Sequence, residues 1–315
     1  MWNVECGMWN VECVKQKYLI VVAGPTAIGK TAFSIKLAKH YKTEILSADS
    51  RQFYSEMRIG TAYPEPEELA AVKHHFIGNL SIKDEYNVAR YEAEALALLD
   101  ELFLKHDVVI LSGGSGLYID AICKGIDELP DHDPGLRQKL KEELEQKGIE
   151  AFGEKLKKLD PEYYEVVDLN NPNRLLRALE VCLQTGETYT SLRKNTSKSR
   201  SFNIIRIALN TERELLFQRI SERVDKMMEK GLPDEARSLL PFREHNALNT
   251  VGYKELFAYF DGDVTLERAV ENIKTNTRRY AKRQLTWLKR DEEMHWFEPD
   301  DFETAIKFLS RHIVP

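Results

Sequence analysis

The sequence is poor in cysteine and contains no long apolar stretch. None of its cysteines belongs to a C-x-x-C pair, so it supports neither a zinc site nor a redox motif, and we expect reduced thiols. The four are Cys6, Cys13, Cys123 and Cys182. The longest apolar run near the start, residues 18–23, is far shorter than the ~20 residues of a membrane-spanning helix. Because no signal-peptide pattern opens the chain either, we expect a cytoplasmic protein without a membrane partner.

The composition is that of an ordinary globular chain. Of 315 residues, 43% are hydrophobic and 30% charged, which excludes collagenous, mucin-like and wholly disordered proteins. The length corresponds to about two domains, or to one core with a large insertion. With 45 basic and 51 acidic residues the net charge is −6, so binding of nucleic acid would require basic residues gathered in one place. The hexapeptide MWNVEC occurs twice within residues 1–16, which we treat as an N-terminal extension, an alternative start or a cloning remnant.

Hydrophobic patterns predict an α/β core built on a parallel sheet. Residues 18–23 and 107–111 are continuous apolar runs typical of strands buried on both faces, and 44–48 indicates a shorter strand. An amphipathic helical pattern follows the first strand, and another leads into the strand at 107–111, which is followed by a helix from about residue 117. Alternating strands and helices form βαβ units and hence a parallel sheet.

The pattern changes between residues 125 and 201. No β-branched run occurs there, and short helical patterns are interrupted by several prolines and glycines. Residues 202–209 then resume the pattern of a strand. We therefore predict a mostly helical insertion domain at 125–201 within a core formed by residues 17–124 and 202–315.

The first predicted strand leads into a phosphate-binding motif, G-x-x-x-x-G-K-[ST]. Its backbone N–H groups and the start of the following helix would surround an anion, Lys30 would add a full positive charge, and the Thr31 hydroxyl would bind Mg²⁺. The predicted loop consists of Gly24, Pro25, Thr26, Ala27, Ile28, Gly29, Lys30 and Thr31. The motif predicts a phosphate or pyrophosphate site without saying which compound occupies it.

One feature argues against the usual assumption of ATP. The strand at 107–111 runs into Ser112, Gly113 and Gly114, so the acid that many nucleotide hydrolases place there is missing. The nearest acid at a strand end is Asp49, which in a doubly wound sheet would lie beside the phosphate loop. Asp49 would position Mg²⁺ or act as a general base; the alternative is that it merely caps a helix.

Several motifs occur together in one order and near one set of spacings. They are GPTAIGKT (24–31), SADSRQFY (47–54), IGTAYP (59–64), KHHF (73–76), GGSGLYI (113–119), NRLLRALEV (173–181), GYKE (252–255) and RRYAKRQLTW (278–287). With them the sequence resembles the tRNA dimethylallyltransferases, the bacterial tRNA prenyltransferases, from about Lys17 to Trp287. The family usually has GGTGLY where this chain has Ser115, so the hydroxyl is retained.

The resemblance implies a P-loop core that transfers a dimethylallyl group. The donor would be dimethylallyl diphosphate, and the acceptor the exocyclic amine of the adenosine 3′ to the anticodon in tRNA. The phosphate loop would then hold a diphosphate leaving group instead of ATP. We expect Mg²⁺ as cofactor, the tRNA anticodon stem-loop as partner and a monomeric protein.

The chemistry of this reaction suggests candidate roles for individual residues. Asp49 would take the proton from the amine, and Ser115 would orient the reaction centre and contact the tRNA. Arg219 and Arg223, one helical turn apart, would stabilise the diphosphate; the alternative is that they lie on a solvated helix face. The candidate tRNA contacts near Asp49, which is itself one of them, are Ser50, Arg51 and Gln52. Those in the insertion are Arg137, Asn173, Arg174, Leu175, Leu176 and Arg177; the alternative for these arginines is a surface ion pair with acids such as Glu180.

Residues 266–290 are the clearest basic segment. The last seventeen of them carry seven cations and no acid. On a helix they would form a cationic strip opposite an apolar stripe, facing away from the phosphate loop. Lys274, Arg278, Lys282 and Arg283 are the candidate tRNA contacts there. Residues 193–206 add five more cations without an acid.

Two other functions fit part of these observations. A P-loop small-molecule kinase would use the same loop, Asp49 and paired arginines, but it would not need the basic helix. A nucleotide-switched RNA-binding module would leave Asp49 without a catalytic task.

Overall fold

The computed structural model describes residues 16–194 and 196–314. The repeated N-terminal hexapeptide, with Cys6 and Cys13, lies outside the described residues. The chain divides into two compact units: one runs up to Cys123 and continues from Arg200, and the other comprises Lys124–Ser199. The second unit corresponds to the insertion expected at residues 125–201.

The first unit is built on a six-stranded sheet in which every neighbouring pair is parallel. The strand order is β3-β2-β4-β1-β5-β6. The strands are β1 Tyr18–Ala23, β2 Ile45–Ser47, β3 His74–His75, β4 Val108–Gly113, β5 Asn203–Leu209 and β6 His295–Phe297. The predicted α/β class with a parallel sheet is confirmed. The two edge strands were not predicted, because two or three residues are too few to show a periodic pattern.

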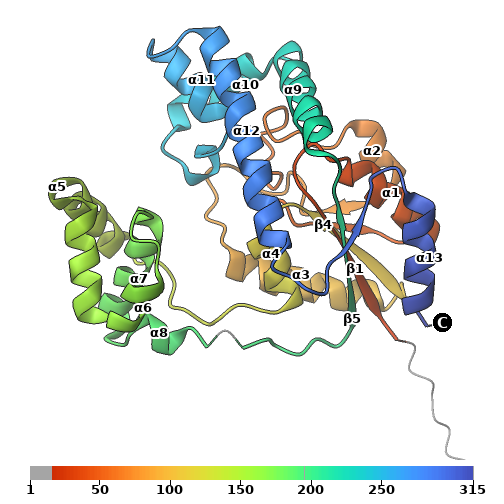
Figure 1. The fold of residues 1–315 in the computed structure, drawn as a ribbon, viewed down its shortest axis with the longest axis horizontal. Helices are drawn as coiled ribbons and strands as arrows, with labels where there is room; N and C mark the ends of the chain where they lie inside the picture. Colours follow the sequence, from red (N-terminus) through yellow and green to blue (C-terminus); the bar gives the residue numbers. More distant parts are fainter. Residues whose placement is uncertain (1–15, 195, 315) are drawn as a thin grey trace, which may run out of the picture. The chain divides into compact units, whose positions relative to one another are not determined.

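Helices cover both faces of the sheet (Figure 1). Side chains alternate along β1, so that Leu19 and Val21 pack with the cluster that includes α3 and α4, whereas Ile20 and Val22 pack with α1 and α13. All four are completely buried, which explains the continuous apolar run. The helices are α1 Lys30–Tyr41, α2 Pro66–Ala71, α3 Val88–Phe103, α4 Gly116–Cys123, α9 Arg213–Glu229, α10 Leu232–Leu239, α11 Tyr253–Phe260, α12 Leu266–Leu288 and α13 Phe302–His312, with 3-10 turns at Leu240–Phe242 and Asn246–Leu248.

The second unit consists of helices with a core of their own. The helices are α5 Pro134–Leu159, α6 Pro161–Val166, α7 Pro172–Thr185 and α8 Tyr189–Leu192. Each begins at a capping side chain that accepts a backbone N–H, and Gly148 interrupts α5 with a non-helical conformation. Leu156, Leu175 and Leu179 are among the fully buried residues of this core. The predicted helical character of the insertion is confirmed.

Two further sequence expectations can be compared with the described residues. Cys123 and Cys182 are buried, and no disulfide joins them, in agreement with the expected reduced thiols. None of the helices in residues 16–194 and 196–314 is long and apolar enough to cross a membrane.

Candidate functional site

The loop between β1 and α1 has the backbone of an anion-binding turn. Gly29 precedes α1 with φ 104°, a left-handed conformation that favours glycine, and Ala27 adopts φ 64°. A left-handed conformation costs a residue with a Cβ about 1–2 kcal/mol, and strain of this kind gathers at ligand sites. Such turns direct successive N–H groups into one concave space. The backbone geometry therefore agrees with the phosphate-binding loop predicted from the motif.

This loop borders a cavity of about 720 Å³. The cavity brings together two groups of residues that are far apart in the sequence, the phosphate loop and the segment after β2. Predicted site residues that line it are Thr26, Ala27, Gly29, Lys30, Thr31, Asp49, Ser50, Arg51, Gln52, Arg223 and Arg283. A cavity of this volume accommodates a ligand of small-molecule size or an extruded base.

The cavity wall carries positive charge that is poorly compensated. Burial lowers the pKa of Lys30 from 10.5 to about 8; Asp49 opposes this shift and Arg223 adds to it. Burial also lowers the pKa of Arg223, again opposed by Asp49. The Lys30 ammonium donates to the carbonyl of Pro25 at 2.8 Å, within its own loop. An anionic ligand would remove the unfavourable burial of these two cations.

Asp49 is presented by a turn and not by a helix. Its Oδ1 accepts the N–H of Arg51 at 3.0 Å, and residues 50–53 are turn and not α-helix, so the alternative that Asp49 caps a helix is wrong. Among the described residues no other hydrogen bond to its carboxylate occurs. One carboxylate oxygen is thus fixed by the turn while the other is available to a ligand in the cavity.

Ser115 supports this turn from the neighbouring loop. Its Oγ accepts the N–H of Ser50 at 3.0 Å and lies 3.2 Å from the Ser50 Oγ, and its own N–H donates to Ala48 at 3.2 Å. The two backbone segments can approach this closely because residue 113 is glycine: a Cβ there would lie 2.3 Å from the carbonyl oxygen of Ala48. Ser115 therefore holds the segment that carries Asp49 in place. Its predicted contact with the tRNA stays a prediction.

Arg51 and Gln52 both bind backbone carbonyls. Arg51 Nη1 donates to Asn246 at 2.9 Å, and Gln52 Nε2 donates to Ala62 at 3.0 Å and Thr61 at 3.3 Å. The amide N–H₂ of Gln52 is thus already used. As a candidate tRNA contact, Gln52 therefore has its acceptor oxygen, Oε1, to offer to a base.

The two arginines of α9 differ in position. Arg223 lines the main cavity and its Nη2 donates to Thr61 at 3.4 Å. Arg219 lines an adjoining cavity of about 610 Å³ that it shares with Arg223, and it lies 3.9 Å from Asp300. Arg219 also donates from Nη1 to the carbonyl of Ile28 in the phosphate loop at 3.4 Å, so both arginines border the loop, and Arg223 is the one of the two that lines the main cavity.

Two site residues on α12 were missed. Gln284 Oε1 accepts the N–H of Thr26 at 2.9 Å and its Nε2 donates to Gly114 at 2.8 Å, so it joins the phosphate loop to the loop after β4. Tyr280 lines the cavity beside Asp49, and burial, with a smaller contribution from Asp49, raises its pKa to about 12. The only signal in the sequence was a glutamine on the face expected to be apolar.

The basic helix does not form a free cationic strip. Lys274 pairs with Asp225 at 2.7 Å, and Arg278 donates to Ser221 at 2.8 Å, so both side chains pack against α9. Arg283 lines the cavity, so the prediction that this face points away from the phosphate loop is wrong for part of the helix. Lys282 remains exposed.

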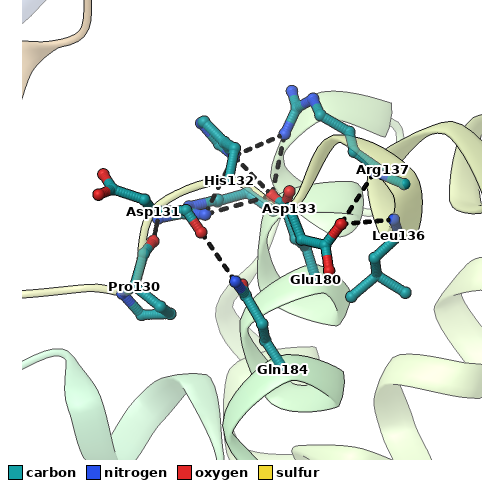
Figure 2. Close-up of polar contacts among 10 residues, drawn as sticks. Pro130, Asp131, His132, Asp133, Leu136, Arg137, Glu180 and Gln184 are labelled. Carbon is teal, nitrogen blue, oxygen red and sulfur yellow. Dashed lines mark hydrogen bonds and ion pairs between the residues drawn. The ribbon is translucent and has the colours of Figure 1, made fainter.

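The candidates in the helical unit fall into three groups. Asn173 and Arg174 are exposed at the start of α7. Leu175 and Leu176 are buried in the core of this unit, so their side chains do not reach an RNA-binding surface and the prediction is corrected for them. Arg137 and Arg177 both contact Glu180 (Figure 2 shows Arg137 and Glu180), as the alternative of an ion pair stated.

The parallel sheet, the glycine loop after β1 and the cavity define an α/β protein of P-loop architecture. Residues 52–291 match the family model for IPP transferase. The sequence is 52% identical to tRNA dimethylallyltransferase 1 of Phocaeicola vulgatus over 291 residues, covering 92% of this chain and 97% of that protein, and 54% identical to tRNA dimethylallyltransferase of Christiangramia forsetii over 284 residues, covering 90% and 94%. This chain belongs to the tRNA dimethylallyltransferase family, as its motifs predicted.

Solved structures agree with this assignment. A full-length tRNA isopentenylpyrophosphate transferase from Bacillus halodurans is 37% identical with a TM-score of 0.68, and the match covers 95% of this chain and 96% of that one. A eukaryotic dimethylallyltransferase acting on tRNA is 26% identical with a TM-score of 0.76, and the match covers 94% and 77%.

Proposed function

We propose that this protein transfers the dimethylallyl group of dimethylallyl diphosphate to the exocyclic amine of the adenosine 3′ to the anticodon in tRNA. The observation that carries the proposal is the shared cavity, in which a carboxylate, Asp49, lies with Lys30 of the phosphate loop and Arg223 of α9. Family membership supports the same reaction. The proposal includes a monomeric enzyme that works in the cytoplasm.

The chemistry requires a stabilised leaving group and a proton acceptor. The adenine amine is a weak nucleophile because its lone pair is delocalised into the ring. As the new N–C bond forms, the C–O bond to the diphosphate breaks and its electron pair leaves with the oxygen. Lys30, Arg223 and the loop N–H groups stabilise that charge, and the free oxygen of Asp49 accepts the amine proton.

The residues at the loop also fit Mg²⁺. The Thr31 hydroxyl lines the cavity together with Asp49, and it bonds to no described residue. The described residues contain no group of three His, Cys, Asp or Glu side chains that could hold a metal. This suits a cation that takes few protein ligands and keeps waters and ligand phosphates. Bound there, Mg²⁺ would neutralise charge on the diphosphate.

The acceptor base must leave the anticodon stack to enter the cavity. Base-edge contacts then come from the turn that carries Asp49, with the Gln52 oxygen as an acceptor for the adenine amine. Arg137, Asn173, Arg174, Arg177, Lys282 and Arg283 are the proposed contacts to the rest of the tRNA. The kinase alternative is not favoured by the comparisons, and it leaves these basic residues without a task.

The test is a transfer assay with unmodified tRNA, isotopically labelled dimethylallyl diphosphate and Mg²⁺. Label that enters the tRNA and disappears when the adenosine 3′ to the anticodon is replaced supports the proposal. ATP turnover with a small acceptor, without transfer to tRNA, would instead support a kinase. Asp49→Asn serves as the matched inactive control, since asparagine can still accept the Arg51 N–H.

A further inference from the structure

The helical unit contains a buried carboxylate that gathers three cationic or potentially cationic groups. Glu180 lies on α7 and its side chain is 0% exposed. One oxygen, Oε2, contacts His132 Nδ1 at 2.7 Å, Arg137 Nη1 at 2.9 Å and Arg177 Nη1 at 3.2 Å. Figure 2 shows Glu180 with His132 and Arg137, which come from the segment that leads into α5 and from its first turn.

The two arginines remain partly accessible although they share this anchor. Their side chains are 29% and 23% exposed, for Arg137 and Arg177 respectively. Arg177 is further fixed by donation from Nη2 to the carbonyl of Pro130 at 2.7 Å. The Nε and Nη2 groups of Arg137 bond to no described residue. Two guanidiniums thus share one carboxylate, and Arg137 keeps N–H donors that could bind a further anion.

Two exposed acids, Asp131 and Asp133, flank His132 in the same segment. Asp133 is engaged in capping α5, where it accepts the N–H groups of Gly135 at 2.8 Å and Leu136 at 3.0 Å. The second oxygen of Glu180, Oε1, is buried and has no hydrogen-bond partner among the described residues. The charge of Glu180 is therefore compensated only through Oε2, and both guanidiniums are held against this single oxygen.

We propose that Glu180 is a positioning residue for RNA binding, which holds Arg137 and Arg177 side by side as one phosphate-binding pair. The inference rests on the proposed function, since it takes the ligand to be the tRNA backbone. Arginine binds phosphate best when its donors are held in a fixed orientation. The opposite view, in which Glu180 competes with phosphate for the same arginines, predicts that removing its charge strengthens RNA binding.

The test compares Glu180→Gln with Glu187→Gln, which removes an equal charge from an exposed position in the same unit. Affinity for the unmodified anticodon stem-loop is measured by filter binding without donor. We expect Glu180→Gln to weaken it roughly tenfold, the lower part of the range for a lost arginine contact. In steady-state assays KM for tRNA should rise while kcat and KM for the donor stay within about twofold. Glu187→Gln should bind as tightly as wild type or more so.

A double-mutant cycle shows whether Glu180 acts through the arginines. In the background of Arg137→Ala with Arg177→Ala, adding Glu180→Gln should cause no further loss of affinity. An equal loss in that background, or affinity unchanged or improved in the single variant, would overturn the inference. If Glu180→Gln unfolds at the assay temperature, the double variant Arg137→Lys with Arg177→Lys replaces it. Lysine keeps the positive charges but loses the fixed pairing of the guanidiniums, so unchanged affinity for the stem-loop would contradict the proposal. Wild-type protein that binds RNA but transfers no label would refute the proposed function alone.

Discussion

The phosphate-loop cavity and the helical unit both collect positive side chains, but they compensate the charges differently. In the cavity, Lys30 and Arg223 share the influence of one carboxylate, Asp49, and burial still lowers both pKa values. In the helical unit, Arg137 and Arg177 each contact the carboxylate of Glu180 directly. The cations of the cavity are stabilised only when an anion binds. The arginines of the helical unit already form ion pairs with Glu180, and Arg137 keeps N–H groups that can bind a further anion.

This difference separates two tasks of one enzyme. A site that must stabilise charge developing on a leaving group gains most from cations that no protein carboxylate has neutralised. A surface that binds a charged polymer such as tRNA has higher affinity when its cationic side chains are already held in the binding geometry. Substitutions in the cavity should therefore change chemistry and donor use, and substitutions in the basic surfaces should change tRNA affinity.

The largest effect is expected for Asp49→Asn. Asparagine can still accept the Arg51 N–H, so the turn should be retained while the proton acceptor is lost. Loss of a general base typically lowers turnover by ~10²–10⁴-fold. Single-turnover transfer and tRNA affinity should be measured on the same variant. Near-normal transfer would remove Asp49 from the mechanism, and a parallel loss of tRNA affinity would show that the turn had collapsed.

Lys30→Ala should have the next largest effect. The Lys30 ammonium donates to the carbonyl of Pro25 within its own loop, where the diphosphate is proposed to bind. Removal of one preorganised donor for a developing anion costs ~10²–10³-fold in turnover. Donor kinetics and tRNA affinity should be determined separately. A large decrease in tRNA affinity with unaltered donor kinetics would mean that the loop does not hold the diphosphate.

The lowered pKa of Lys30 also predicts a pH dependence. Below about pH 8 the ammonium is charged and binds the diphosphate fully. Above that pH the free protein has lost the proton and must regain it on binding, so donor affinity should decrease by up to about tenfold per pH unit. Titrations of donor affinity between pH 7 and 9.5 test this. Lys30→Arg keeps its charge and should flatten the profile; an identical slope in both proteins contradicts the assignment.

The sequence predicted the architecture better than the side-chain contacts. Buried apolar runs located β1, β4 and β5, because a strand covered on both faces has a pattern that depends only on local residues. The glycine motif located the phosphate loop for the same reason. The pairing of Lys274 with Asp225 and the clamp formed by Gln284 depend on how α12 packs against distant segments. No periodicity within residues 266–288 contains that information, so the basic face was predicted as continuous.

The smallest effect is expected for single cations on α12, which should differ in how much they contribute to the salt dependence of tRNA binding. Lys282 is exposed, whereas Lys274 is neutralised by Asp225 and only 15% of its side chain is exposed. Each phosphate contact contributes ~0.7–0.9 to the slope of log K against log salt. We expect Lys282→Ala to flatten the slope by about that amount for all tRNAs, and Lys274→Ala to leave it unchanged. Arg278→Ala should resemble Lys274→Ala, since Arg278 donates to Ser221. Filter-binding titrations at several salt concentrations provide the comparison. Equal slopes for all three variants, each smaller than that of wild type, would support a continuous basic strip on α12. Slopes equal to that of wild type in all three variants would mean that α12 binds no tRNA phosphate and that the helical unit supplies these contacts.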